Sequence, residues 1–155
     1  MALNIEDFVE GLRGSRAHFL KHLDGLSPDQ ITWKPYPECK SVIETLQHLV
    51  IDDTAAIESL KSNDHPNYDA IKVEETDFSS LLSLLAESHA KLIAQIVTQF
   101  GSGPLDAEAC AWGSKLPAAR AIATLSSEDY FHAGQVSFIR MATDPTWDYY
   151  EKIYS

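Results

Sequence analysis

The chain has 155 residues and a mass of 17.2 kDa, which suits one domain, and its 45% hydrophobic and 23% charged residues are typical of a globular protein. A formal net charge of -11, with no cluster of Lys or Arg, argues against nucleic acid or an anionic membrane as a partner. Cys39 and Cys110 stand in no metal-binding spacing, and we find neither a cleavable signal nor a long apolar run, so we expect a soluble cytoplasmic protein.

Helical periodicity dominates the first part of the chain, because apolar residues recur three and four positions apart. A first helix is expected over residues 4–24, with Gly25 as its C-terminal cap. Its apolar side is formed by Ile5, Phe8, Val9, Leu12, Phe19, Leu20 and Leu23. Residues 25–40 contain three prolines, which disfavour helix, so we expect a structured loop there.

Ser41 and Glu44 have the spacing of a capping box and predict the start of a second helix, which runs through the sequence VIETLQHLVIDDTAAIESL. A third helix is predicted over residues 77–100, where leucine and isoleucine again recur with helical spacing. The GSGP sequence that follows ends it, and a polar, irregular segment comes next.

A fourth helix is predicted from Pro117, a favourable first-turn residue, to about Met141. From about residue 144 the chain becomes an aromatic tail, which we expect to pack on the other helices or on a partner. Four long helices in residues 1–155 predict a single all-α domain with up-down four-helix-bundle architecture, in which the longer loops are the places to look for a site.

Glu128 and His132 are the first candidates for chemistry, since both project from the apolar side of the fourth helix. A buried carboxylate is costly unless it is paired, protonated or bound to a cation, so an inward Glu one turn from an inward His favours a metal ion. The pattern also allows a structural Glu128–His132 hydrogen bond without any metal.

His48 is the natural third ligand, because an antiparallel second helix would bring it opposite the fourth. Periodicity alone, however, places it on the polar side of its helix, together with Glu44 and Asp52. These two carboxylates, each one turn from His48, are candidates to orient its imidazole from outside the ligand set.

The other histidines are weaker candidates. His18 and His22 have the H-x-x-x-H spacing of many zinc helices but lie off the apolar stripe, which predicts a solvated face. His65 and His89 have no partner at a matching spacing. The loop aromatic residues Trp33, Tyr36 and Trp112 could line a substrate pocket or simply cover the ends of the core.

Two motifs resemble the DinB/YfiT-like family of metalloenzymes. The sequence ITWKPYPECKSVIETLQHL is similar to the family's Trp-Lys-Pro loop followed by a helix that reaches a metal histidine, here His48. The sequence HAGQVSFIR is similar to the family's His-Arg-Gly-Gln segment and implies a metal ligand at His132. The family usually has a further histidine one turn earlier, where this chain has Glu128, and an aromatic residue where this chain has Lys40.

The resemblance implies a site of two histidines and one carboxylate, His48, His132 and Glu128, which suits Ni, Zn, Fe(II) or Mn and leaves positions for water or substrate. It also implies transferase or isomerase chemistry with a low-molecular-weight thiol, and a homodimer. Two alternatives remain open at this point. One is a non-catalytic bundle that binds a metal or small molecule, and the other is a helical dimer with no metal.

Overall fold

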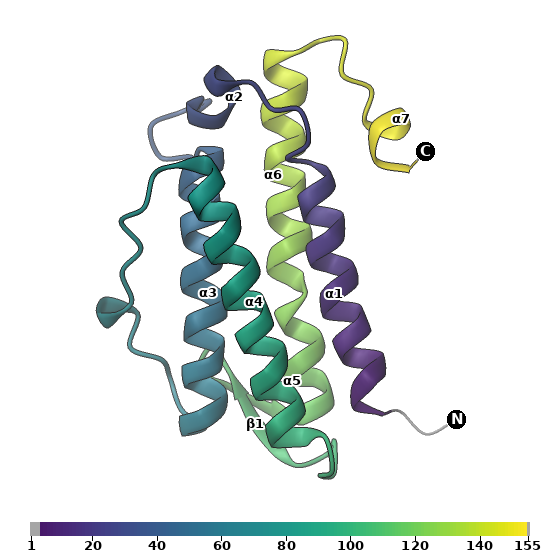
Figure 1. The fold of residues 1–155 in the computed structure, drawn as a ribbon. Helices are drawn as coiled ribbons and strands as arrows, with labels where there is room; N and C mark the ends of the chain where they lie inside the picture. The colour runs from purple at the N-terminus through teal and green to yellow at the C-terminus, as the bar shows by residue number, and fades with distance from the viewer. Residues whose placement is uncertain (1–3, 155) are drawn as a thin grey trace.

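The computed structural model describes residues 4–154, and these are mostly helical (Figure 1). The long helices are α1 (Ile5–Lys21), α3 (Val42–Ser62), α4 (Phe78–Phe100), α5 (Ala118–Leu125) and α6 (Ser127–Thr143). The short elements are α2 (Pro28–Thr32), the 3-10 helix η1 (Tyr68–Ala70), the strands β1 (Glu108–Ala111) and β2 (Ser114–Pro117), and α7 (Tyr149–Tyr154).

The long helices lie side by side, with α3 packed against α4 and α1 against α6 (Figure 1). Figure 1 also shows that residues 63–77 cross back along the molecule, so that α3 and α4 run in the same direction. The predicted up-down order, in which each helix reverses the one before it, therefore does not describe this pair. The crossing is possible because α3 is about 30 Å long, whereas an extended segment of this length reaches roughly 50 Å.

The start of α3 agrees with the sequence prediction. Ser41 accepts a hydrogen bond from the backbone N–H of Glu44, and the Glu44 carboxylate accepts one from the Ser41 N–H. The loop at residues 25–40 departs from the prediction, because it contains α2. Pro28 is at the first turn, where proline costs no hydrogen bond, and Ser27 caps the helix through Gln30.

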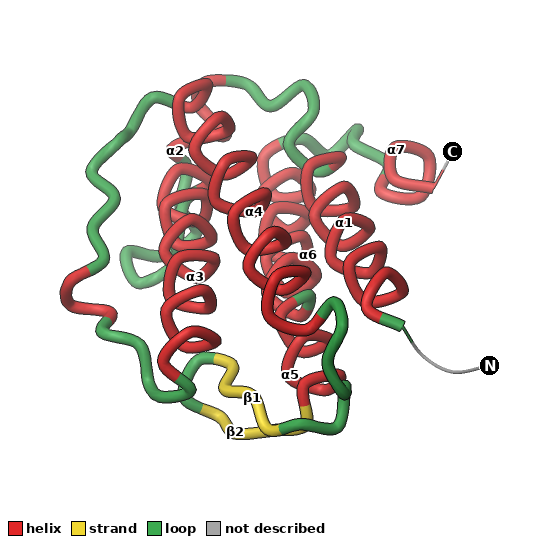
Figure 2. The backbone as a smooth tube through the Cα atoms, turned by 60° about the horizontal axis from the view of Figure 1, so that its bottom comes forward, coloured by secondary structure: helices red, strands yellow, loops and turns green. Residues whose placement is uncertain are grey.

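The segment between α4 and α5 forms an antiparallel β-hairpin, which periodicity did not predict (Figure 2). Its two-residue turn consists of Trp112 and Gly113, with φ angles of 48° and 90°. Two positive φ values are the requirement of the tight turns that match the twist of a hairpin. A Cβ atom at Gly113 would lie 2.5 Å from the ring of His65, so glycine is also required by space.

The predicted fourth helix is divided into α5 and α6 at Ser126. The hydroxyl of Ser126 donates to the carbonyl of Ala123, and that of Ser127 donates to the carbonyl of Thr124. Side-chain hydrogen bonds of this kind compete with the helical backbone pattern and favour a break. As a result α6 begins one residue before Glu128.

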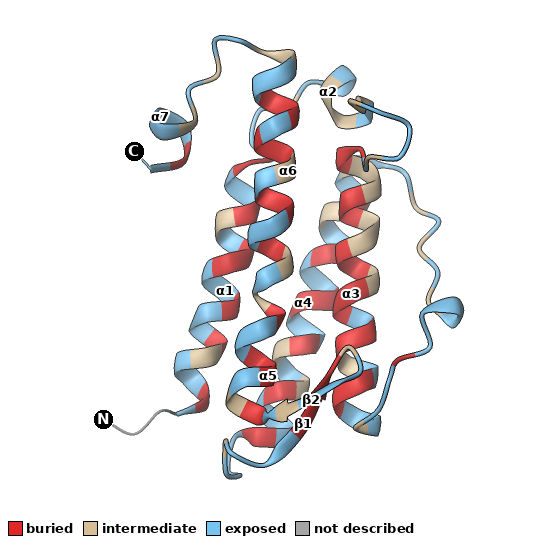
Figure 3. Ribbon diagram, turned by 180° about the vertical axis from the view of Figure 1, so that it is seen from behind, coloured by how far each residue is buried: buried red, intermediate tan, exposed pale blue. Residues whose placement is uncertain are grey.

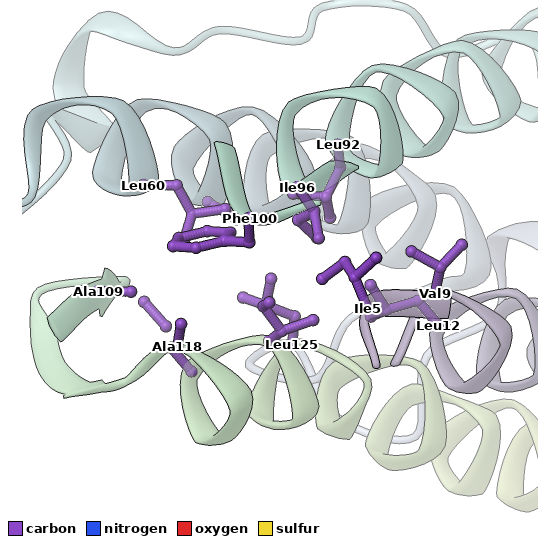
Figure 4. Close-up of a cluster of buried hydrophobic side chains, with 14 residues drawn as sticks. Ile5, Val9, Leu12, Leu60, Leu92, Ile96, Phe100, Ala109, Ala118 and Leu125 are labelled. Atoms are coloured by element: carbon purple, nitrogen blue, oxygen red, sulfur yellow. The ribbon is translucent and has the colours of Figure 1, made fainter. Parts of the chain in front are cut away.

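The buried apolar side chains form two clusters, one at each end of the long helices. Figure 3 shows buried positions, in red, along the whole length of these helices. The cluster in Figure 4 joins Ile5, Leu60 and Phe100 with the hairpin and α5, while the other surrounds Phe19 and Leu46. Between them along the helices lies a layer of buried polar residues: Ser15, Arg16, Asp52, Asp53, Ser88, His89, Asp129 and His132. The candidate site belongs to this layer.

The aromatic tail packs on α1. Ile153 of α7 is buried, and its carbonyl accepts a hydrogen bond from Lys21. None of the helices within residues 4–154 is long and apolar enough to cross a lipid bilayer.

Candidate metal centre

Four side chains from two helices converge at one point of the polar layer. His48 and Asp52 are one turn apart on α3, and Glu128 and His132 are one turn apart on α6. One ligand atom from each lies within 4.8 Å of the others. Two ligands held about 2.1 Å from a metal ion are roughly 3 to 4 Å apart, so the arrangement is close to that of a metal site.

The tautomer of His132 is fixed by a neighbour on its own helix. Its Nδ1 lies 2.7 Å from Oε1 of Gln135, so Nδ1 carries the hydrogen and donates it to the amide oxygen. The Nε2 atom therefore presents a lone pair. This atom is buried and has no hydrogen-bond partner within residues 4–154, although Oε2 of Glu128 lies 3.4 Å away. Two lone pairs that face one another in this way require a cation or a proton between them.

His48 lies across from His132, with the two ring centroids 4.9 Å apart. Its Nε2 is 3.0 Å from Oδ2 of Asp52 and 3.7 Å from Oε2 of Glu128. The shorter distance is that of an ion pair if the imidazole carries a proton. Nε2 must be free of hydrogen to bind a metal, so binding to a protonated His48 would release a proton.

The two carboxylates differ in electrostatics. Burial raises the pKa of Asp52 to about 6, against the influence of His48. Hydrogen bonds that His132 and His48 form to Glu128 when they carry a proton lower the pKa of Glu128 to about 2. With both histidines neutral, the cluster carries negative charge from Glu128 and, once it ionises, from Asp52. No Arg or Lys side chain among the described residues forms an ion pair with either carboxylate.

Aromatic residues from the hairpin and the crossing segment flank this cluster. The Trp112 indole N–H donates to the backbone carbonyl of Asp52 over 3.1 Å. Burial raises the pKa of Tyr68, and the nearby charges of Asp52 and Glu128 raise it further. The positive φ of Trp112 is unfavourable for a bulky residue, and strain of this kind is common beside functional sites.

Three residues predicted to surround the site do not contact the four converging side chains. The Glu44 carboxylate is occupied by the Ser41 N–H and by Lys34, so it does not orient His48. Trp33 is at the end of α2, half-buried against the apolar cluster around Phe19. Tyr36 is 67% exposed in the loop before α3, next to a pocket that borders Gln135.

Among the other histidines, His18, His22 and His89 are more buried than the sequence suggested, while His65 is exposed. His22 is 1% exposed rather than solvated, because α7 covers it and places Tyr149 5.9 Å from its ring. His18 is half-buried beside Tyr130 and Tyr154. His89 is also buried, in the polar layer.

Sequence reasoning placed Asp52 outside the ligand set and overlooked Gln135 and Tyr68. The i, i+4 spacing of His48 and Asp52 is the same as that of Glu128 and His132, and this repeated spacing was the available signal for Asp52. Gln135, three residues after His132, carried a similar signal. Tyr68 carried none, because its place depends on the path of the crossing segment.

A comparison with known protein families gives one match. The model of the DinB superfamily matches residues 12–136, which include all four converging side chains. The chain belongs to the DinB superfamily. Neither the curated proteins nor the solved structures contain a significant match to this chain.

The donor set fits a divalent metal ion. Two imidazole nitrogens and two carboxylate oxygens suit Zn, Fe(II), Mn or Ni, and the unpartnered Nε2 of His132 is already in the tautomer that binds a metal. This DinB superfamily member thus has a potential metal site formed by His48, Asp52, Glu128 and His132.

Proposed function

We propose that this DinB-superfamily protein is a divalent-metal-dependent enzyme of the thiol transferase or isomerase type, in which the metal is held by His48, Glu128 and His132 with Asp52 as a fourth donor. The observation that supports the metal is the buried Nε2 of His132, which lies 3.4 Å from the Glu128 carboxylate and has no hydrogen-bond partner among the described residues. Resemblance to thiol-using DinB/YfiT-like enzymes supports the choice of a low-molecular-weight thiol as substrate.

A bound divalent ion lowers the pKa of a coordinated thiol and so supplies a thiolate near neutral pH. The protein's own residues prepare the site for this chemistry. Gln135 holds the His132 ring in one orientation, and Trp112 ties the hairpin to the backbone beside Asp52. Tyr68 keeps its proton, because its pKa is raised, and is available to donate a hydrogen bond to a substrate.

A second candidate is a non-catalytic metal site, and one observation favours it. Four donors converge rather than the three predicted from sequence. In a tetrahedral zinc site four protein ligands leave no position for substrate, which is typical of structural zinc. In a six-coordinate Fe(II), Mn or Ni site the same donors leave two positions free. The identity of the metal therefore separates the two functions.

The first experiment is metal analysis of protein purified without added metal, followed by calorimetric titration of the chelated protein with Zn, Ni, Mn and Fe(II). We expect one ion per chain, with binding lost in Glu128→Gln and His132→Gln. Matched controls are Glu44→Gln, on the same helix as His48, and His18→Gln, in the other pair with i, i+4 spacing. An empty wild type that stays empty would contradict the metal site and favour a purely structural helical dimer.

The second experiment measures thiol transfer to a series of electrophiles by chelated and metal-loaded protein. We expect turnover only with metal, and none for Glu128→Gln. Metal binding at full stoichiometry without turnover for any thiol would reject the enzyme and support the non-catalytic site.

A further inference from the structure

A pocket of about 520 Å³ lies between α6 and the loop that precedes α3. Phe131 and Phe138 of α6 form one wall, and Tyr36 and Lys40 come from the loop. Phe131 is 63% exposed, Phe138 52% and Tyr36 67%. A volume of this size is in the range of small-molecule sites, and large apolar rings exposed together around a hollow are typical of a ligand pocket.

Gly134 leaves part of the pocket wall without a side chain. It lies in the middle of α6 and lines the pocket between the two phenylalanines. Glycine weakens a helix relative to alanine, so a helical glycine usually serves close packing. Here a Cβ atom would meet nothing within 4 Å. Packing within the chain therefore does not require glycine, and what its missing side chain leaves is open space in the pocket.

The pocket borders the candidate metal centre without including any of its four donors. Gln135 lines the pocket and also accepts the hydrogen bond from His132. The ring of Phe131 lies 5.2 Å from the ring of His132. Gln135 and Phe131 thus connect the pocket to His132, whereas Gly134, two residues after His132, lies on nearly the opposite side of α6.

The chemistry of the walls indicates what kind of molecule fits. Three aromatic rings offer stacking and edge contacts to a flat aromatic body. Lys40 is the single cation among the lining residues and forms no ion pair within residues 4–154, while Glu38 is the single acid. An anionic substituent next to Lys40 would gain a partner that the protein itself does not supply.

We propose that this pocket is the binding subsite of the second substrate and that it accepts a small aromatic carboxylate, which lies on Gly134 between Phe131 and Phe138 with its carboxylate at Lys40. The assignment of this ligand as the electrophile rests on the proposed thiol-transfer function. The binding itself does not, because no metal donor lines the pocket.

The test is equilibrium binding of 2-naphthoate to the full chain, with and without metal, followed by fluorescence and calorimetry. Gly134→Leu fills the pocket and should weaken binding at least tenfold, with an unchanged or higher Tm and unchanged metal stoichiometry. Gly134→Ala adds only a methyl group and should have a smaller effect. Ala90→Leu, in the groove between α1 and α4, is the matched control and should bind like wild type.

Two further comparisons test the ligand class. Decahydro-2-naphthoate, of similar shape but without aromatic rings, should bind more weakly, and so should 2-naphthalenemethanol, which lacks the charge. Lys40→Met should remove most of the preference for the anion, and Phe138→Ser, at an exposed position, should weaken 2-naphthoate even if Gly134→Leu fails to fold. Wild-type affinity in Gly134→Leu or Phe138→Ser would overturn the subsite, as would an effect confined to Ala90→Leu.

Failure of the subsite and failure of the proposed function give different results. If metal does not bind but 2-naphthoate binds in a manner sensitive to Gly134→Leu, the subsite stands and the metalloenzyme does not. If metal binds and thiol turnover occurs while Gly134→Leu leaves the affinity for 2-naphthoate unchanged, the proposed enzyme function is supported and this subsite is wrong.

Discussion

Two polar clusters lie next to each other in the middle of the molecule, and the same two helices supply carboxylates to both. Asp52 and Asp53 are neighbours on α3, and Glu128 and Asp129 are neighbours on α6, yet the members of each pair enter different clusters. The cluster of Asp53 and Asp129 contains its own cation, Arg16. The cluster of Asp52 and Glu128 contains two histidines instead.

In the Arg16 cluster every carboxylate oxygen has a donor. The guanidinium donates to both oxygens of Asp53 and to Oδ1 of Asp129. The hydroxyls of Ser15 and Ser88 supply the remaining hydrogen bonds. The cluster joins α1, α3, α4 and α6 and is complete without any added group.

In the histidine cluster not every buried polar atom has a hydrogen-bond partner. The buried Nε2 of His132 has no partner among the described residues, and burial raises the pKa of Asp52 because no Arg or Lys compensates its charge. The contrast shows that this chain can neutralise buried carboxylates with an arginine where it needs only structure. Where it does not, a divalent cation supplies the missing charge in our proposal.

The largest expected effect comes from breaking the complete cluster. Arg16→Met leaves Asp53 and Asp129 buried without a counter-charge, and loss of one partner of a buried ion pair costs about 3 to 5 kcal/mol. Urea denaturation of chelated and metal-loaded protein should show this loss in both. Arg13→Met, which removes only an exposed pair with Glu10, should change stability by less than about 1 kcal/mol. Equal effects of the two substitutions would contradict the contrast.

A smaller effect, on metal affinity, is expected from Gln135, which orients His132 in the histidine cluster. Gln135→Leu removes the acceptor that fixes the His132 tautomer, and loss of such a partner lowers metal affinity roughly 10- to 100-fold. Gln135→Glu keeps an acceptor and should retain affinity. Gln95→Leu, at an exposed hydrogen bond with Gln99, is the matched control. Calorimetric titration with the metal that binds wild type checks all three, and unchanged affinity in Gln135→Leu would remove its positioning role.

Local features of the molecule could be predicted from the sequence, whereas features that depend on contacts between distant segments could not. Capping and 3.6-residue periodicity are local, so Ser41, the extent of α4 and the inward direction of His132 followed from the residues themselves. The direction of α4 and the hairpin did not, because both depend on how distant segments meet. His48 lies on a polar side of α3 that becomes half-buried only through packing against α6, and for this residue the DinB/YfiT resemblance supplied what periodicity could not.

The smallest expected effect is a pH dependence that arises beside the complete cluster, at His89. Burial lowers the pKa of His89, and Arg16 and Arg13 add to this against the opposite influence of Asp53 and Asp129. The unfolded chain therefore binds a proton more readily than the folded one. The stability that His89 contributes is present above its unfolded pKa of about 6.5 and is lost as the pH falls below it.

His89→Leu should accordingly flatten the decline in unfolding free energy between pH 7.5 and pH 5.5, in urea titrations of chelated protein. His22, whose pKa is also lowered by burial, retains its own contribution in the variant, so the decline should shrink rather than vanish. A variant with the same decline as wild type would show that the buried His89 ring is solvated or paired in solution. Water would then reach the Arg16 cluster despite its hydrogen bonds. The two clusters would differ in their charged residues and not in their access to water.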